Sequence, residues 1–261
     1  MRVALISLNQ AWENKADNFK ACRSFVQRVK SEGVDLVIFP EMTLTGFTIN
    51  TRAAPEDPLE SITVELFRRL AEEFDIAIVF GVVFCCGCKS TNNAILIDAD
   101  GTILANYTKI HPFSFSGEDQ FFQAGNEICA VRLGTLTIGL TICYDLRFPE
   151  LYSALGKQCD LIINIANWPV GRIDHWNTLL KARAIENQLF VAGVNRNGTD
   201  GNGLEYTKSS MVINPNGLSL MPILAERDVD IYNIESSFIE QFRQTFSTVQ
   251  DRKSWLYKII L

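Results

Sequence analysis

A glutamate, a lysine and a cysteine each stand directly after an apolar, strand-like run of this sequence. Glu41 follows LVIFP, Lys109 follows ILANYT and Cys143 follows LTIGLTI. Proteins that alternate strands and helices hold their active sites at strand ends of this kind. The three groups together can carry out acyl transfer. The glutamate would take the thiol proton, the sulfur would attack a carbonyl carbon, and the lysine would stabilise the oxyanion.

Each of the three residues, taken alone, also has a structural explanation. A cysteine at the end of an apolar run is usually a small core residue, and a lysine can extend past apolar neighbours to solvent. A glutamate after a buried strand can be a member of a structural ion pair. A nucleophilic cysteine needs the thiolate, which positive charge and a helix N-terminus favour. Cys143 precedes a stretch expected to be helical over residues 146–157, with Pro149 suited to a first turn. The combination of the three residues, rather than any one of them, supports catalysis.

Apolar periodicity predicts the elements that position these residues. Strands are expected over residues 2–8, 34–40, 76–82, 159–166 and 189–194, and helices over 12–32, 59–74, 146–157 and 174–188. Hairpins are expected over 92–109, 127–142 and 209–223, the last turning at Asn216-Gly217. Two β-α-β halves with interposed hairpins predict one α/β domain over residues 1–261, with a mixed sheet or two facing sheets.

Composition excludes several functional classes. A net charge of −6 argues against a nucleic-acid partner, which would require clustered Lys and Arg. No apolar run approaches the roughly 18 residues of a membrane span, so we expect no membrane partner. Seven cysteines without regular spacing or a cleavage signal favour a reducing cytoplasm over a disulfide framework. The apolar tail, residues 247–261, is expected to pack on the body or at a subunit interface.

Two competing sites involve other cysteine and histidine residues. Cys85 and Cys88 have a Cys-x-x-Cys spacing, but too few further ligands accompany them for zinc, and no helix follows them as in a redox pair. We interpret them as residues at a strand end or hairpin turn, and expect no metal. His111 lies close enough in sequence to Lys109 to act as the base for Cys143 in a cysteine-histidine device.

Three segments resemble the signature segments of the nitrilase superfamily of carbon-nitrogen hydrolases. They are FPEMTLTGF, YTKIHPF and TICYDLRFPELY, and ANWP, KARAIENQ and DGNG match further. The resemblance implies a four-layer α-β-β-α sandwich, a Glu41-Lys109-Cys143 triad, a second glutamate at Glu118 and no cofactor. It also implies a homodimer. The chain is most similar to the omega-amidase branch, whose substrates are omega-amides of 2-oxo dicarboxylic acids such as 2-oxoglutaramate.

The expected substrate contacts follow from this reading. The backbone N–H of Tyr144 would complete an oxyanion hole, and aromatic residues would form the walls of a small pocket. The proposed substrate-binding residues are Tyr144, Phe113, Trp168, Arg147 and Trp176, with Phe47 and Phe115 as further aromatic walls. Arg147, Arg172 and Arg183 are candidates for binding a substrate carboxylate. An N-carbamoyl or N-acyl compound, a nitrile, or a non-catalytic binding role remain alternatives.

Overall fold

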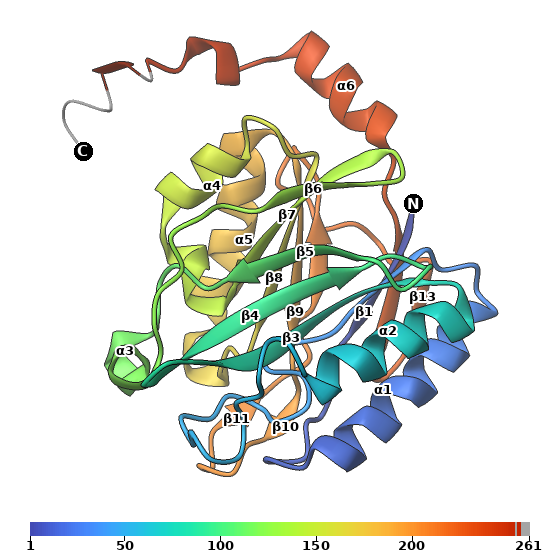
Figure 1. Ribbon diagram of the computed structural model, residues 1–261. Coiled ribbons are helices and arrows are strands. Elements are labelled where there is room, and N and C mark those ends of the chain that lie inside the picture. The colour runs from blue at the N-terminus through green and yellow to red at the C-terminus, as the bar shows by residue number, and fades with distance from the viewer. Residues whose placement is uncertain (254, 257–261) are drawn as a thin grey trace.

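Two β-sheets face each other in the computed structural model, which describes residues 1–253, 255 and 256 (Figure 1). The larger sheet has the strand order β13-β14-β1-β2-β3-β4-β5. Its strands are β1 (Arg2–Ile6), β2 (Leu36–Ile38), β3 (Ala77–Cys86), β4 (Lys89–Ile97), β5 (Ile103–Thr108), β13 (Leu224–Ala225) and β14 (Val229–Asn233). Strands β1, β2 and β3 are parallel, and β4 and β14 run antiparallel to their neighbours.

The smaller sheet has the order β12-β9-β8-β7-β6. Its strands are β6 (Ala130–Leu133), β7 (Leu136–Ile142), β8 (Leu161–Ala166), β9 (Phe190–Asn195) and β12 (Met211–Ile213). Strands β7, β8 and β9 are parallel. A separate ribbon consists of β10 (Gly198–Thr199) and β11 (Glu205–Tyr206).

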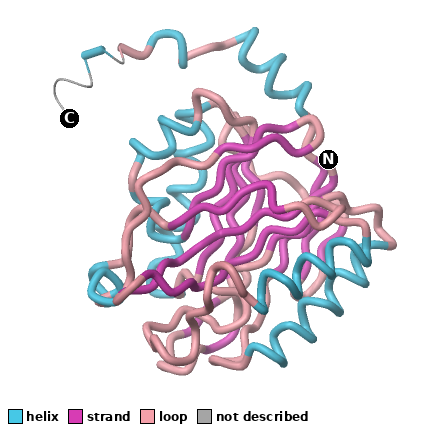
Figure 2. Tube along the Cα trace, in the orientation of Figure 1, coloured by secondary structure: helices cyan, strands magenta, loops and turns pink. Residues whose placement is uncertain are grey.

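Helices cover the outer face of each sheet, as the tube in Figure 2 also shows. The longer helices are α1 (Lys15–Lys30), α2 (Ile62–Phe74), α4 (Pro149–Leu155), α5 (Ile173–Asn187) and α6 (Ser236–Thr245). The short ones are α3 (Glu118–Phe121) and the 3-10 turns η1 (Ser114–Ser116), η2 (Cys143–Arg147), η3 (Val170–Arg172) and η4 (Val249–Asp251). Side-chain caps start α1 and α2, where Asn14 accepts from Asp17 N and Ser61 accepts from Val64 N.

The layers follow from strands that are apolar on both faces. On β1, Val3 and Leu5 enter the core between the two sheets, whereas Ala4 and Ile6 pack under α1 and α2. On β8, Ile163 likewise faces the other sheet, and its neighbours face α4 and α5. A strand buried on both faces needs a nearly continuous apolar sequence. Strand β1 has one over residues 3–6, and Asn164 alone interrupts that of β8. The result is the predicted four-layer α-β-β-α sandwich.

Several predicted elements differ in detail. The helix expected over 146–157 divides at Phe148, so that a 3-10 turn begins at Cys143 and α4 begins at Pro149. Only the first arm of the 209–223 hairpin is a strand, although Leu220 N bonds back to Val212 O around the Asn216-Gly217 turn. The strand β14 and the helix α6 were not predicted.

The first part of the C-terminal tail contacts the end of α5. Thr248 N donates to Gln188 Oε1 at 2.8 Å, and Arg252 Nη2 donates to Glu186 O at 2.7 Å. Trp255 is exposed. The prediction for the tail also covers residues 254 and 257–261, which lie outside the described residues. No described helix has the length and apolar character needed to cross a membrane.

Candidate active site

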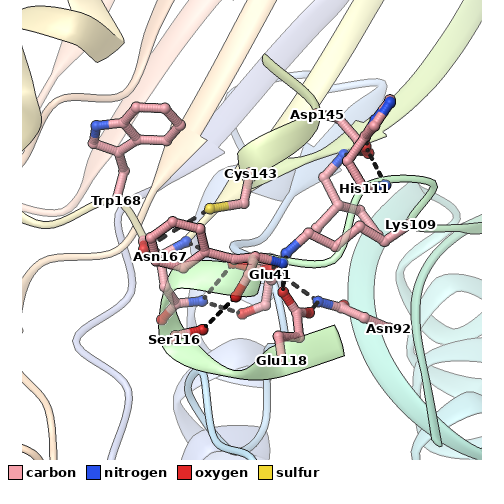
Figure 3. A network of polar contacts seen from close by, with 12 residues as sticks. Glu41, Asn92, Lys109, His111, Ser116, Glu118, Cys143, Asp145, Asn167 and Trp168 are labelled. Carbon is pink, nitrogen blue, oxygen red and sulfur yellow. Dashed lines mark hydrogen bonds and ion pairs between the residues drawn. The ribbon is translucent and has the colours of Figure 1, made fainter. Parts of the chain in front are cut away.

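The predicted catalytic residues come together at one edge of the sandwich, where strands of both sheets end. Glu41 follows β2 and Lys109 follows β5 in the larger sheet, whereas Cys143 follows β7 in the smaller one. Strand β5 runs parallel to β2, because two antiparallel pairings separate it from β3. The carboxyl ends of β2, β5 and β7 therefore share an edge, and their side chains converge there (Figure 3).

Glu41 is fully buried and accepts hydrogen bonds at both carboxylate oxygens. Its Oε1 lies 3.1 Å from Lys109 Nζ and 2.8 Å from Asn92 Nδ2. Its Oε2 accepts from the backbone N–H of Asn167 at 2.9 Å. These donors compensate for the loss of water around the carboxylate, which would otherwise make its burial unfavourable.

Lys109 lies between two buried carboxylates. Its Nζ is 2.8 Å from Glu118 Oε2 and 3.1 Å from Glu41 Oε1. Burial opposes the charged ammonium, but the carboxylates of Glu118 and Glu41 outweigh that effect and raise the pKa of Lys109 above its usual value. Glu118 also accepts from Phe113 N at 2.6 Å and is fully buried, so it is not a solvated loop acid. The structure thus places all three charged groups in one network.

Cys143 begins the turn η2 in a left-handed backbone conformation, with φ of +46°. A non-glycine residue in this region costs about 1–3 kcal/mol and is typical of functional turns. Its Sγ points towards the carbonyl of Asn167 at 4.0 Å and away from His111 (Figure 3). Burial, together with the charge of Glu41, raises the pKa of the Cys143 thiol, and the Lys109 ammonium only partly opposes this. The raised pKa favours the protonated thiol over the thiolate, so attack by this sulfur would require a base.

A pocket of about 520 Å³, open to solvent, lies over Cys143. Its lining includes the predicted Tyr144, Phe113, Trp168 and Arg147, together with Phe47, Lys109, Asn167, Arg172 and Tyr206. The Arg147 guanidinium lies 4.8 Å from the Trp168 ring, and that of Arg172 lies 5.5 Å from the Phe113 ring. The pocket therefore combines apolar walls, two guanidinium groups and a thiol.

Some residues expected at the site lie elsewhere. Trp176 is fully buried behind Trp168 and donates to Ser209 O, so it does not line the pocket. Phe115 is almost fully exposed and is also outside the lining. Arg183 is buried beneath the turn η2, where it donates to Leu146 O and pairs with Glu186. Size and apolar character could not distinguish a pocket wall from the layer behind it.

His111 and the clustered cysteines are also away from the reacting groups. His111 Nδ1 lies 2.8 Å from Asp145 Oδ1, and its ring stacks on Phe148. Cys85 and Cys88 are exposed at the end of β3 and in its turn to β4, as predicted for a hairpin. Within the described residues, no group of three or more His, Cys, Asp or Glu side chains is arranged to hold a metal ion.

Sequence reasoning missed two asparagines of the network. Asn92 Nδ2 donates to Glu41 Oε1 and, at 3.1 Å, to Glu118 Oε1, thereby joining the two glutamates. Asn167 donates to Glu41 through its backbone and its side chain. A buried asparagine in the strand run NNAILID was an available signal for Asn92. Asn167 lies in the ANWP stretch, in which only Trp168 was predicted to be a site residue.

Comparison with known proteins gives consistent matches over the whole chain. The family profile described as carbon-nitrogen hydrolase matches residues 2–244. Omega-amidase YafV of Escherichia coli strain K12 is 32% identical, with 96% of each chain covered. A 2-oxoglutaramate amidase of Paenarthrobacter nicotinovorans is 35% identical, covering 84% of this chain and 79% of that protein. The crystal structure of a CN-hydrolase superfamily protein from Xanthomonas campestris superimposes with a TM-score of 0.89 at 32% identity, covering 97% of each chain.

Proposed function

The chain belongs to the carbon-nitrogen hydrolase family, and from this premise we propose that it hydrolyses a small carboxamide to a carboxylic acid and ammonia. The observation that carries the proposal is the buried network in which Lys109 contacts both Glu41 and Glu118 below a pocket floored by Cys143. A protein that only binds a ligand has no need for a buried carboxylate in contact with a buried ammonium beneath a thiol. The protonation of the resting thiol favours Glu41 as the base.

In the first half of the reaction, Cys143 forms a covalent acyl-enzyme. Glu41 takes the thiol proton as Sγ attacks the amide carbon, which produces a tetrahedral oxyanion. Lys109 Nζ and the backbone N–H of Tyr144 stabilise that oxyanion. The Tyr144 N–H can donate to it because this residue lies in the first turn of η2, where backbone N–H groups have no partner inside the helix. Glu41 then returns the proton to the nitrogen, the carbon–nitrogen bond breaks, and ammonia leaves.

In the second half, water replaces the departed ammonia. Glu41, again a carboxylate, removes a proton from this water as its oxygen attacks the thioester carbon. The carbon–sulfur bond breaks, and the thiolate recovers the proton from Glu41. Glu118 and Asn92 keep Lys109 and Glu41 in place during both halves, because Glu118 accepts from Lys109 and Asn92 donates to both Glu41 and Glu118. No step requires a cofactor.

We further propose that the substrate carries its own carboxylate, as an omega-amide of a 2-oxo dicarboxylic acid does. Within the described part of the chain, neither Arg147 nor Arg172 forms an ion pair with an acidic side chain, although both line the pocket. A guanidinium stacked on an aromatic ring stays available for a bidentate carboxylate contact. The omega-amidase and 2-oxoglutaramate amidase relatives point to the same class. Arg183 is excluded because its guanidinium is bound beneath η2.

The test is ammonia release from a panel of small amides, nitriles and N-carbamoyl compounds. We expect turnover of 2-oxoglutaramate by the native chain and none by Cys143→Ala, with the acyl adduct found on residue 143 by mass spectrometry. Ammonia release that survives Cys143→Ala would refute the mechanism. Turnover of a nitrile or an N-carbamoyl compound alone would redirect the substrate assignment.

The same panel tests the two arginines. Arg172→Met and Arg147→Met should lower kcat/KM for 2-oxoglutaramate by about 10-fold to 100-fold, as expected for the loss of one charged hydrogen-bonding group. They should leave kcat/KM for butyramide, which has no carboxylate, nearly unchanged. Arg183→Met does not serve as a control, because it supports η2; Arg227→Met, outside the pocket lining, does. An equal loss on both amides would show that the arginines do not bind the carboxylate.

The proposal includes a homodimer in the cytoplasm. The cytoplasmic location is supported by the cysteines, all seven of which are free thiols within the described residues. The dimer is supported by apolar side chains left exposed near the C-terminus, including Phe246 and Trp255.

A further inference from the structure

Asp145 is a fully buried carboxylate that the reaction scheme above does not use. It stands two residues after Cys143, in the turn η2. Its Oδ2 accepts from Tyr107 OH at 2.7 Å and from Ile142 N at 2.9 Å. Its Oδ1 accepts from His111 N at 3.0 Å and lies 2.8 Å from His111 Nδ1. The two oxygens thus have four polar contacts with three other residues.

These contacts connect the segments that carry two catalytic residues. Tyr107 lies two residues before Lys109 and His111 two residues after it, and the Tyr107 hydroxyl also accepts from Ile110 N at 3.3 Å. Burial and the neighbouring Asp145 carboxylate raise the pKa of Tyr107, so its hydroxyl stays protonated and remains a donor. Asp145 therefore joins the end of β5 in the larger sheet to the turn after β7 in the smaller sheet.

Asp145 also restrains the turn that presents the nucleophile. Its carboxylate accepts a hydrogen bond from the backbone N–H of Ile142, the residue directly before Cys143. The φ of Cys143 is +46°. Backbone in this region persists only where surrounding contacts hold it. Ring stacking of His111 on Phe148, with centroids 3.7 Å apart, holds the other end of the turn. His111 thus supports the nucleophile through Asp145, although its ring does not reach the sulfur (Figure 3).

We propose that Asp145 is a positioning residue that sets the distance between the Cys143 sulfur and the Lys109 ammonium, with Tyr107 and His111 as its donors. The inference rests on the proposed role of Cys143 as nucleophile. Lys109 and Cys143 come from different sheets. The core between the sheets sets the overall spacing of the sheets, and the contacts of Asp145 join the two segments locally. A displacement of about 1 Å between reacting groups can cost about 100-fold in rate.

The decisive variant is Asp145→Asn, which keeps the side-chain shape but replaces one acceptor oxygen with an NH₂ group facing donors. We expect kcat for 2-oxoglutaramate to fall about 100-fold with little change in KM, since the pocket walls stay in place. The matched control is Asp160→Asn at the opposite end of β7, where Oδ2 accepts from Thr137 N at 2.8 Å. The control should keep native kcat. A native kcat in Asp145→Asn would overturn the proposal.

A pair of His111 variants keeps the inference testable if Asp145→Asn does not fold. His111→Asn retains a side-chain N–H near the position of Nδ1, whereas His111→Leu, of similar shape, has none. We expect His111→Asn to retain most of the native kcat and His111→Leu to lose about 10-fold, the size expected for one charged hydrogen bond. Equal kcat in the two variants would show that the donor to Asp145 has no positioning role.

Alkylation of the thiol tests the inference independently of any substrate. Lys109 favours the Cys143 thiolate, so a displaced Lys109 should slow the reaction of iodoacetamide with residue 143 in Asp145→Asn but not in Asp160→Asn. Peptide mass spectrometry must follow residue 143, because Cys85, Cys86 and Cys88 are exposed and also react. An unchanged or faster rate would contradict the proposal. Absence of ammonia release from the native chain would instead refute the proposed function and leave this comparison valid.

Discussion

At the scale of single residues, the chemistry depends on the charges around one thiol. Burial and the Glu41 carboxylate raise the pKa of Cys143, whereas Lys109 lowers it. Lys109 also forms an ion pair with Glu118, and the Glu118 carboxylate partly offsets the effect of the Lys109 charge on the sulfur. In the proposed mechanism, the thiol holds its proton until a substrate arrives, and Glu41 receives it during attack. This arrangement keeps an oxidisable thiolate from accumulating at rest.

Glu41→Gln should therefore have opposite effects on turnover and on thiol acidity. Loss of the base should lower kcat by about 100-fold to 10,000-fold. Loss of the negative charge removes one cause of the raised pKa of Cys143, so thiolate should form at lower pH than in the native chain. The measurement is the rate of iodoacetamide labelling at residue 143 across neutral and alkaline pH, beside ammonia release.

The control for this prediction is Glu240→Gln, an exposed glutamate on α6. It should change neither kcat nor the labelling profile. A labelling profile that moves to higher pH in Glu41→Gln would mean that Glu41 stabilises the thiolate rather than the thiol, which would contradict the assigned charge balance.

At the scale of elements, a close backbone approach positions Glu41, the proposed base. Gly81 on β3 lies against the loop after β2, where a Cβ would come within 2.3 Å of Met42 N and 2.9 Å of Glu41 C. Thr43 links this loop to β3 by hydrogen bonds. Its hydroxyl donates to Pro40 O at 2.7 Å and accepts from Gly81 N at 2.8 Å. Both clashing atoms belong to the backbone, so a side chain at this position would displace Glu41.

Gly81→Ala should destabilise the fold and reduce activity together. We expect the free energy of unfolding in urea to fall by at least about 2 kcal/mol, within the range for overpacking a buried site, and kcat to fall with it. Gly171→Ala is the control for stability, because nothing lies within 4 Å of its added Cβ; it should stay within about 1 kcal/mol of the native chain. Native stability in Gly81→Ala would show that the loop can move away without cost.

At the scale of the whole molecule, the site exists because two sheets are packed face to face. One sheet supplies Glu41, Asn92 and Lys109, and the other supplies Cys143 and Asn167. The shared core between the sheets fixes their separation. Helix α6 and the turn η4 lie outside the two sheets (Figure 1), and Phe246 and Trp255 are exposed.

If this segment forms the dimer interface, polar substitutions there should separate the subunits. We expect the native chain to sediment at twice its 29.3 kDa mass, and Phe246→Ser with Trp255→Ser to shift it towards the monomer. The control is Leu59→Ser, at an even more exposed apolar residue before α2, and it should remain dimeric. A native chain that sediments as a monomer would refute the homodimer.

The residue types and local patterns of the sequence were enough to predict much of this protein. Runs such as LVIF and IAIVF are apolar at every position, which predicts strands buried on both faces. The family resemblance added the four layers. Reactive groups directly after strand-like runs predicted Glu41, Lys109 and Cys143 as catalytic residues, and the family resemblance added Glu118. The helix expected from Leu146 was less accurate, because hydrogen bonds from outside the segment hold η2 in place.

Only the tertiary structure decided which partners these groups have. Glu41 and Lys109 lie 68 positions apart, and Asn167 lies 126 positions from Glu41, so no local pattern relates them. Local patterns also do not show that Arg147 and Arg172 line the pocket whereas Trp176 and Arg183 do not. Nor do they show that Asp145 contacts residues of both sheets. The apolar periodicity of a segment predicts whether one or both faces of that strand are buried. The distance between two strand ends on facing sheets depends on the packing of the core between them, which is a property of the whole chain.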